Sequence, residues 1–117
     1  MDLDFLNNIG RADFHNAAER LMNHYCIIKR DSRDGQEVLY RFAEIEFYLY
    51  DASTPELDVN TYDRDCAEIE WFFHKSGVDI AFRTSSEGNE LIRFGGILIR
   101  GVKIINETSR IDGTKLA

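Results

Sequence analysis

The sequence predicts an α+β domain with an N-terminal helix followed by several strands. Apolar residues recur with helical spacing over residues 13–25, alternate strictly over 38–50, and form further strand-like runs at 78–84 and 97–105. The chain has 117 residues, 44% of them hydrophobic and 12% aromatic, which is enough for one core and too short for two. We therefore expect residues 1–117 to form a single domain.

The N-terminal third predicts a helix that leads into a hairpin. Asn16 and Glu19 have the spacing of a capping box, which places the start of the regular helix near Asn16. Residues 25–28 have the apolar character of a short buried strand. A polar turn over 31–36 follows, and its Asp-Gly pair is typical of hairpins. The helical stripe consists of Phe14, Ala17, Ala18, Leu21, Met22 and Tyr25.

The strongest predicted strand, 38–50, carries two glutamates on one face. Glu44, Glu46 and Tyr48 share that face with Val38, Tyr40 and Phe42, because side chains alternate along a strand. One interpretation is a solvent-exposed face, since Glu is seldom buried without a partner. The other is a functional carboxylate in an aromatic pocket, where desolvation raises its pKa and suits it to act as a general base.

The second half predicts a long loop and more strands. Residues 51–65 are polar, contain the only proline and form a loop of a length that is often functional. Residues 68–74 fit either a short helix or a strand, and 85–90 form a turn. Gly95-Gly96 is interpreted as a turn before the last strand, with close backbone approach as the alternative. The predicted core is Phe14, Leu21, Ile27, Ile45, Phe47, Ile80, Phe82, Ile97 and Ile99.

Charge and cysteine content narrow the function classes. The net charge is −7, and residues 51–70 alone carry one basic and seven acidic side chains, which argues against strong nonspecific DNA binding. A local basic face remains open, built from Arg83, Arg93, Arg100 and Lys103. Two cysteines cannot form a disulfide framework, and no apolar run is long enough for a membrane helix. We expect a cytoplasmic protein without a membrane partner.

Two further side chains are candidates for supporting roles. His74 follows three aromatic residues and is interpreted as a hydrogen-bonded structural histidine, with an orienting or proton-transfer role as the alternative. Arg100 closes an apolar strand, where a charge either reaches solvent or pairs with a carboxylate such as Glu44 or Glu46. The histidine and cysteine spacing predicts no metal site, and no phosphate-binding or dinucleotide motif predicts a cofactor.

Several segments resemble the methylpurine-DNA glycosylases. They are residues 14–21 (FHNAAERL), 27–30 (IIKR) and 41–49 (RFAEIEFYL), followed by 77–82 and 97–100. Residues 71–74, 77–80 and 95–101 more closely resemble a group of uncharacterised bacterial and fungal glycosylase-like proteins. The resemblance implies a glycosylase-like α+β fold with a mixed or antiparallel curved sheet and an N-terminal helix. It also implies that Glu46 activates water, that Tyr48 and Phe82 hold a flipped base, and that Arg100 lies near the phosphate of the flipped nucleotide. Glu44 and His74 would support the site.

The chain also departs from that family. Its loop over 51–65 lacks the family's histidine, the residue that wedges into DNA corresponds to Ser85, and the chain ends where the family's domain continues. One hypothesis is hydrolysis of N-glycosidic bonds of damaged purines in DNA. The alternative is a non-catalytic module that binds a nucleobase-like or other small ligand. A third hypothesis is a partial domain whose activity needs further sequence.

Overall fold

The computed structural model describes residues 3–57, 61–105 and 114–116, and for the last three only the backbone. Helix α1 (Phe14–His24) leads directly into strand β1 (Tyr25–Arg30) and the long strand β2 (Glu37–Asp51). The hairpin β3 (Glu70–His74) and β4 (Gly77–Ala81) follows, then β5 (Ser85–Glu87), the long strand β6 (Glu90–Ile104) and β7 (Thr114–Leu116). The predicted turn at Asp112-Gly113 lies outside the described residues.

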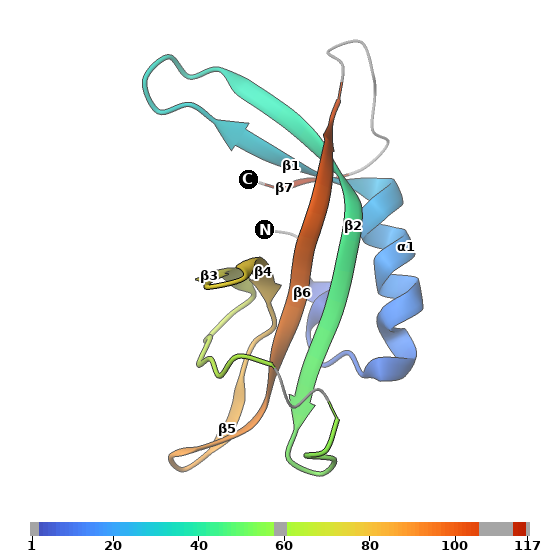
Figure 1. Cartoon of the computed structure of the whole chain (residues 1–117), viewed down its shortest axis with the longest axis vertical. Helices are drawn as coiled ribbons and strands as arrows, with labels where there is room; N and C mark the ends of the chain where they lie inside the picture. Colours follow the sequence, from blue (N-terminus) through green and yellow to red (C-terminus); the bar gives the residue numbers. More distant parts are fainter. Residues whose placement is uncertain (1–2, 58–60, 106–113, 117) are drawn as a thin grey trace.

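Within the described residues, seven strands form one curled sheet in the order β3-β4-β6-β2-β1-β7, with β5 paired to β6. Its pairs are antiparallel except β1–β7, which is parallel. The two long strands β2 and β6 run side by side, with α1 along β2 and the β3–β4 hairpin on the side of β6 (Figure 1). The predicted α+β class and mixed, mostly antiparallel sheet are confirmed.

The start of the helix differs from the prediction. Helix α1 begins at Phe14 rather than near Asn16, because a 3₁₀ turn over Arg11–Asp13 brings the backbone into a helical conformation first. The Asp13 carboxylate stabilises this turn by accepting a hydrogen bond from the Gly10 N–H at 2.8 Å. The prediction of a capping box that starts the helix at Asn16 is therefore wrong.

The core forms where α1 and the N-terminal residues pack on the sheet. Phe14 stacks on Phe47 with 4.6 Å between ring centroids, which joins α1 to β2. All nine predicted core residues belong to this cluster or pack against it. The prediction missed the N-terminal contribution of Leu3, Leu6 and Ile9, which are buried there too.

Strict alternation along β2 is interrupted near its middle. Phe42 was expected on the face of Glu44 and Glu46 but is buried in the core. The pairing of β2 with β6 shifts register between Phe42 and Ile45, and such an irregularity breaks the period of two that the prediction assumed. Beyond it, regular pairing resumes from Ile45 to Asp51.

No helix among the described residues is long and apolar enough to cross a membrane.

Candidate functional site

The sheet face opposite the core carries the candidate site. Glu46 of β2 pairs with Leu98 of β6, and Leu98 pairs in turn with Asp79 of β4. Residues paired across a ladder project to the same face, so a carboxylate, a leucine and a second carboxylate form one row across three strands. Tyr48 lies on this face two residues after Glu46. Regular alternation thus brings together side chains from distant parts of the chain.

A buried ion pair anchors the loop before β3 to this face. The Arg64 guanidinium donates from Nη1 to Asp79 Oδ2 at 2.7 Å and to the Gly95 carbonyl at 3.3 Å, and from Nε to the Tyr62 carbonyl at 3.0 Å. Its carbon Cζ lies 4.2 Å from the centroid of the Phe72 ring. Arg64 therefore holds the backbone of the loop at Tyr62 against the sheet.

Gly96 makes room for this guanidinium, and Gly95 lets β6 approach the backbone of β2 at Tyr48. Gly95 and Gly96 lie within β6 rather than in a turn before it, so the turn interpretation is wrong and the close approach is correct. A Cβ atom on Gly96 would lie 2.9 Å from Arg64 Nη1 and 2.6 Å from the Ile80 carbonyl oxygen. Any side chain at position 96 would thus compete with the arginine for the same space.

His74 is held at both ring nitrogens. Its Nδ1 accepts a hydrogen bond from the Ser76 N–H at 3.1 Å, and its Nε2 lies 2.8 Å from Asp79 Oδ1. An Nδ1 that accepts has no proton, so the proton of the neutral ring is on Nε2, which donates to the carboxylate. His74 orients Asp79 and the β3–β4 turn, as the structural interpretation of the sequence predicts.

Glu46, Tyr48 and Arg100 form a second polar group on β2 and β6. The Tyr48 hydroxyl donates to Glu46 Oε2, and Arg100 Nη1 donates to Glu46 Oε1 at 2.6 Å. The Tyr48 hydroxyl and then the Arg100 guanidinium hold the pKa of Glu46 below its usual value, although desolvation opposes them. The raised pKa expected from an aromatic pocket is therefore wrong, because partners that favour the charged form outweigh desolvation.

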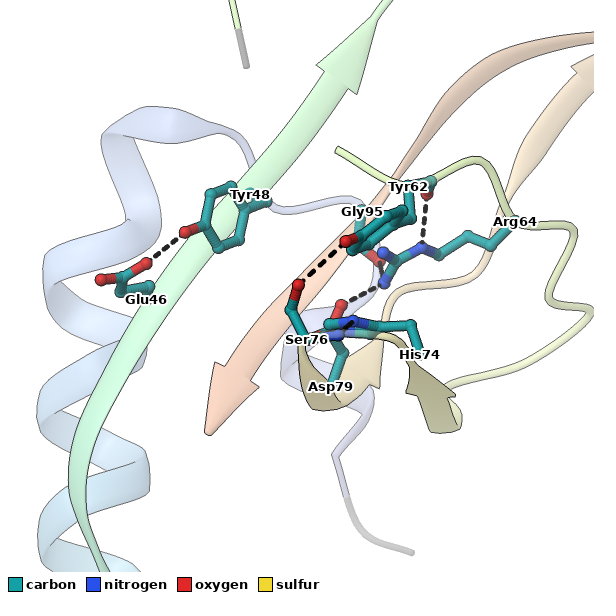
Figure 2. A network of polar contacts seen from close by, with 8 residues as sticks. All are labelled: Glu46, Tyr48, Tyr62, Arg64, His74, Ser76, Asp79 and Gly95. Atoms are coloured by element: carbon teal, nitrogen blue, oxygen red, sulfur yellow. Dashed lines mark hydrogen bonds and ion pairs between the residues drawn. The ribbon is translucent and has the colours of Figure 1, made fainter. Parts of the chain in front are cut away.

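A pocket of about 230 Å³ lies between these two groups. Figure 2 shows Tyr48 on one side of it and Tyr62 with His74 on the other. The Tyr62 ring lies 4.7 Å from the His74 ring, and its hydroxyl is 2.9 Å from Ser76 Oγ. Thr61, Arg64, Asp79 and Leu98 complete the lining. Two aromatic walls around hydroxyl groups suit a small, flat, polar ring.

The structure brings together most of the predicted site residues, but not all. Phe82 is only 2% exposed and belongs to the core, because alternation from Ile80 places it on the face opposite Tyr48. It cannot present its ring to a ligand, so its base-binding role is wrong. Glu46 lies beside the pocket rather than in its lining. Glu44 is exposed and borders an open depression with Glu46 and Arg100.

The remaining predicted features offer little chemistry. Of the four cations of the predicted basic face, Arg100 pairs with Glu46, and Arg93 lies 4.0 Å from Asp51. Cys66 is a buried free thiol, and burial raises its pKa to about 11. Such a thiol is protonated at neutral pH and is not a nucleophile. No group of three or more His, Cys, Asp or Glu side chains in the described part of the chain could hold a metal ion.

Sequence reasoning missed Arg64, Asp79 and Tyr62, although the first two left a signal. Arg64 is the only basic residue within the acidic segment 51–70, and Asp79 interrupts the apolar strand around Val78 and Ile80. A charge inside an apolar strand usually has a buried partner. Tyr62 left no comparable signal, because its place depends on how Arg64 anchors the loop.

Comparison with models of protein families, with curated proteins and with solved structures found no match to this chain.

Proposed function

We propose that this protein binds a nucleobase-like ring against Tyr48 and hydrolyses its N-glycosidic bond with Glu46 as the general base. In this reaction Glu46 takes a proton from water, the water oxygen bonds to the sugar carbon, and the carbon–nitrogen bond breaks. The base leaves with the bonding electrons and takes up a proton. Damaged purines in DNA are the proposed substrates, and a reducing cytoplasm is the proposed compartment.

One observation carries this proposal: an ionised, partly exposed carboxylate shares a hydrogen bond with the aromatic wall of a pocket. A glutamate is already ionised at neutral pH, and the lowered pKa of Glu46 keeps its carboxylate charged at lower pH as well. The carboxylate can therefore accept a proton from water. Tyr48 lines the pocket and donates to the same carboxylate, which links ring binding to the base. The resemblance of residues 41–49 to a glycosylase strand supports the same assignment.

The second candidate is ring binding without chemistry. It is favoured by the two strong hydrogen bonds to Glu46, one on each oxygen, which lower its basicity. Flipping a base out of duplex DNA also requires unstacking, and the pairing of Arg93 and Arg100 with carboxylates leaves less positive charge for phosphates.

Base release under single-turnover conditions separates the two candidates. Wild-type protein in excess over alkylated or deaminated duplexes should release free base, and Glu46→Gln should lower the rate by about 10²–10⁴-fold, the usual contribution of a general base. Glu90→Gln, which changes an exposed carboxylate at the start of β6, should release base at the wild-type rate. If wild-type protein binds the ring but releases no base, binding without chemistry replaces hydrolysis.

A further inference from the structure

One buried hydroxyl in the pocket wall has no hydrogen-bond partner among the residues that the structure describes. This hydroxyl is Oγ1 of Thr61, a residue that is 9% exposed and lines the pocket. A buried polar atom without a partner usually costs free energy, so native structures contain few of them. A hydroxyl in a pocket wall that has no protein partner is open to a hydrogen bond with a ligand.

The charged groups in the pocket floor are already neutralised. Arg64 pairs with Asp79 at 2.7 Å, and Asp79 also accepts a hydrogen bond from His74. Both carboxylate oxygens of Asp79 and both nitrogens of His74 are therefore engaged. The pocket presents no net charge from these groups, which gives an anion such as phosphate no advantage there.

Hydroxyl groups are what the pocket can still offer to a ligand. The Thr61 hydroxyl can donate or accept a hydrogen bond. The Tyr62 and Ser76 hydroxyls share one hydrogen bond, which uses the proton of one of them and leaves the proton of the other free to donate to a ligand. The volume of about 230 Å³ is smaller than the ~300–1,000 Å³ of sites for drug-sized molecules, and fits about one ring system. An uncharged heterocycle with donors and acceptors on its edge matches both properties.

We propose that Thr61 is the specificity-determining residue of this pocket, and that its hydroxyl selects an uncharged heterocycle by hydrogen bonding to the ring edge. This inference rests on the proposed ring binding but not on hydrolysis. Thr61 is the residue before Tyr62, whose carbonyl Arg64 holds against the sheet. The anchor that builds the aromatic wall therefore also fixes the position of the hydroxyl.

Binding of free hypoxanthine, followed by NMR titration of the backbone amides of Tyr62 and Leu98, tests this assignment. Wild-type protein should bind hypoxanthine and show no response to inorganic phosphate at the same concentration. Thr61→Val, which keeps the shape and removes the hydroxyl, should weaken hypoxanthine binding by about 5–30-fold, the usual effect of one lost hydrogen bond to a buried partner. Thr61→Ser, which keeps the hydroxyl, should stay close to wild type.

The unliganded proteins provide a second measurement that does not depend on any ligand. Thr61→Val should melt at the same temperature as wild type or higher, because it removes a buried hydroxyl that has no partner. A clearly lower melting temperature would show that the hydroxyl has a structural partner, and would overturn the proposal.

The outcomes separate this inference from the proposed function. Equal hypoxanthine binding by wild type and Thr61→Val would overturn the role of Thr61 and leave ring binding intact. A response to phosphate that exceeds the response to hypoxanthine would overturn the selection of uncharged rings. No binding of hypoxanthine by wild type would overturn ring binding itself. Base release without any effect of Thr61→Val on binding or rate would overturn the role of Thr61 and leave both ring binding and hydrolysis standing.

Discussion

The Arg64–Asp79 and Arg100–Glu46 ion pairs have almost the same contact distance, 2.7 Å and 2.6 Å, but they differ in exposure. The side chains of the first pair are 1% and 3% exposed, and those of the second are 52% and 38% exposed. A buried charge needs its partner, because no water is present to solvate the charge when the partner is lost. An exposed pair exchanges its partner for water at little cost, so its groups stay available to a substrate.

This contrast assigns different tasks to two chemically similar pairs. Arg64 and Asp79 build the pocket, since they hold the loop at Tyr62 and orient His74. Arg100 instead acts on the carboxylate of Glu46, which it helps to keep ionised. The following variants test this division, from the largest expected effect to the smallest.

Loss of the buried arginine should have the largest effect. Arg64→Met leaves Asp79 buried without its cation and should lower the free energy of unfolding by about 3–5 kcal/mol, measured by urea denaturation. Arg100→Met, the matched exposed change, should move the urea midpoint far less. Arg64→Lys provides a milder variant in case Arg64→Met does not fold, and it should be less stable than wild type because Lys cannot form the same fork of hydrogen bonds. Equal midpoints for the two Met variants would contradict the division.

A methyl group placed under the buried guanidinium should have an intermediate effect. Gly96→Ala puts a carbon 2.9 Å from Arg64 Nη1 and 2.6 Å from a backbone oxygen, and should cost about 1–3 kcal/mol through overpacking. Gly101→Ala is the matched control beside Arg100, because its new carbon would meet nothing closer than 3.7 Å. Thermal denaturation should therefore separate the two alanine variants. The same melting temperature for both would show that neither Arg64 nor the backbone of β4 packs tightly against position 96.

The smallest effect should appear as a change of pKa at the exposed pair. Tyr48→Phe and Arg100→Ala each remove a group that favours the charged form of Glu46, so each should raise its pKa toward the usual value. In wild type, the stabilisation from these contacts is present above the usual pKa of a glutamate and is lost as pH falls through the lowered one. Carboxyl NMR titration of Glu46 from neutral pH downward measures the change. An unchanged pKa in both variants would show that neither contact persists in solution.

The sequence by itself determined the elements and the interior of this protein. Apolar periodicity identified α1, the long strand β2, the second half of β6 and the nine residues of the predicted core, because burial of an apolar face is a local property of a helix or strand. It missed the first half of β6, where Gly95-Gly96 was interpreted as a turn. It also placed Glu46 and Tyr48 on one face and suggested Arg100 as the partner of a glutamate on that strand. These inferences needed only spacing along one strand and the chemistry of opposite charges.

The tertiary structure alone decided which residues make the pocket. Tyr62 and Arg64 come from a loop with no periodicity. Arg64 reaches Asp79 only because β4 pairs with β6 and Gly96 leaves space above that strand. The shift of register near Phe42 likewise moved an aromatic side chain from the expected face into the core. Pairing between distant segments and the space left between their side chains are long-range properties, and no local pattern in the sequence encodes them.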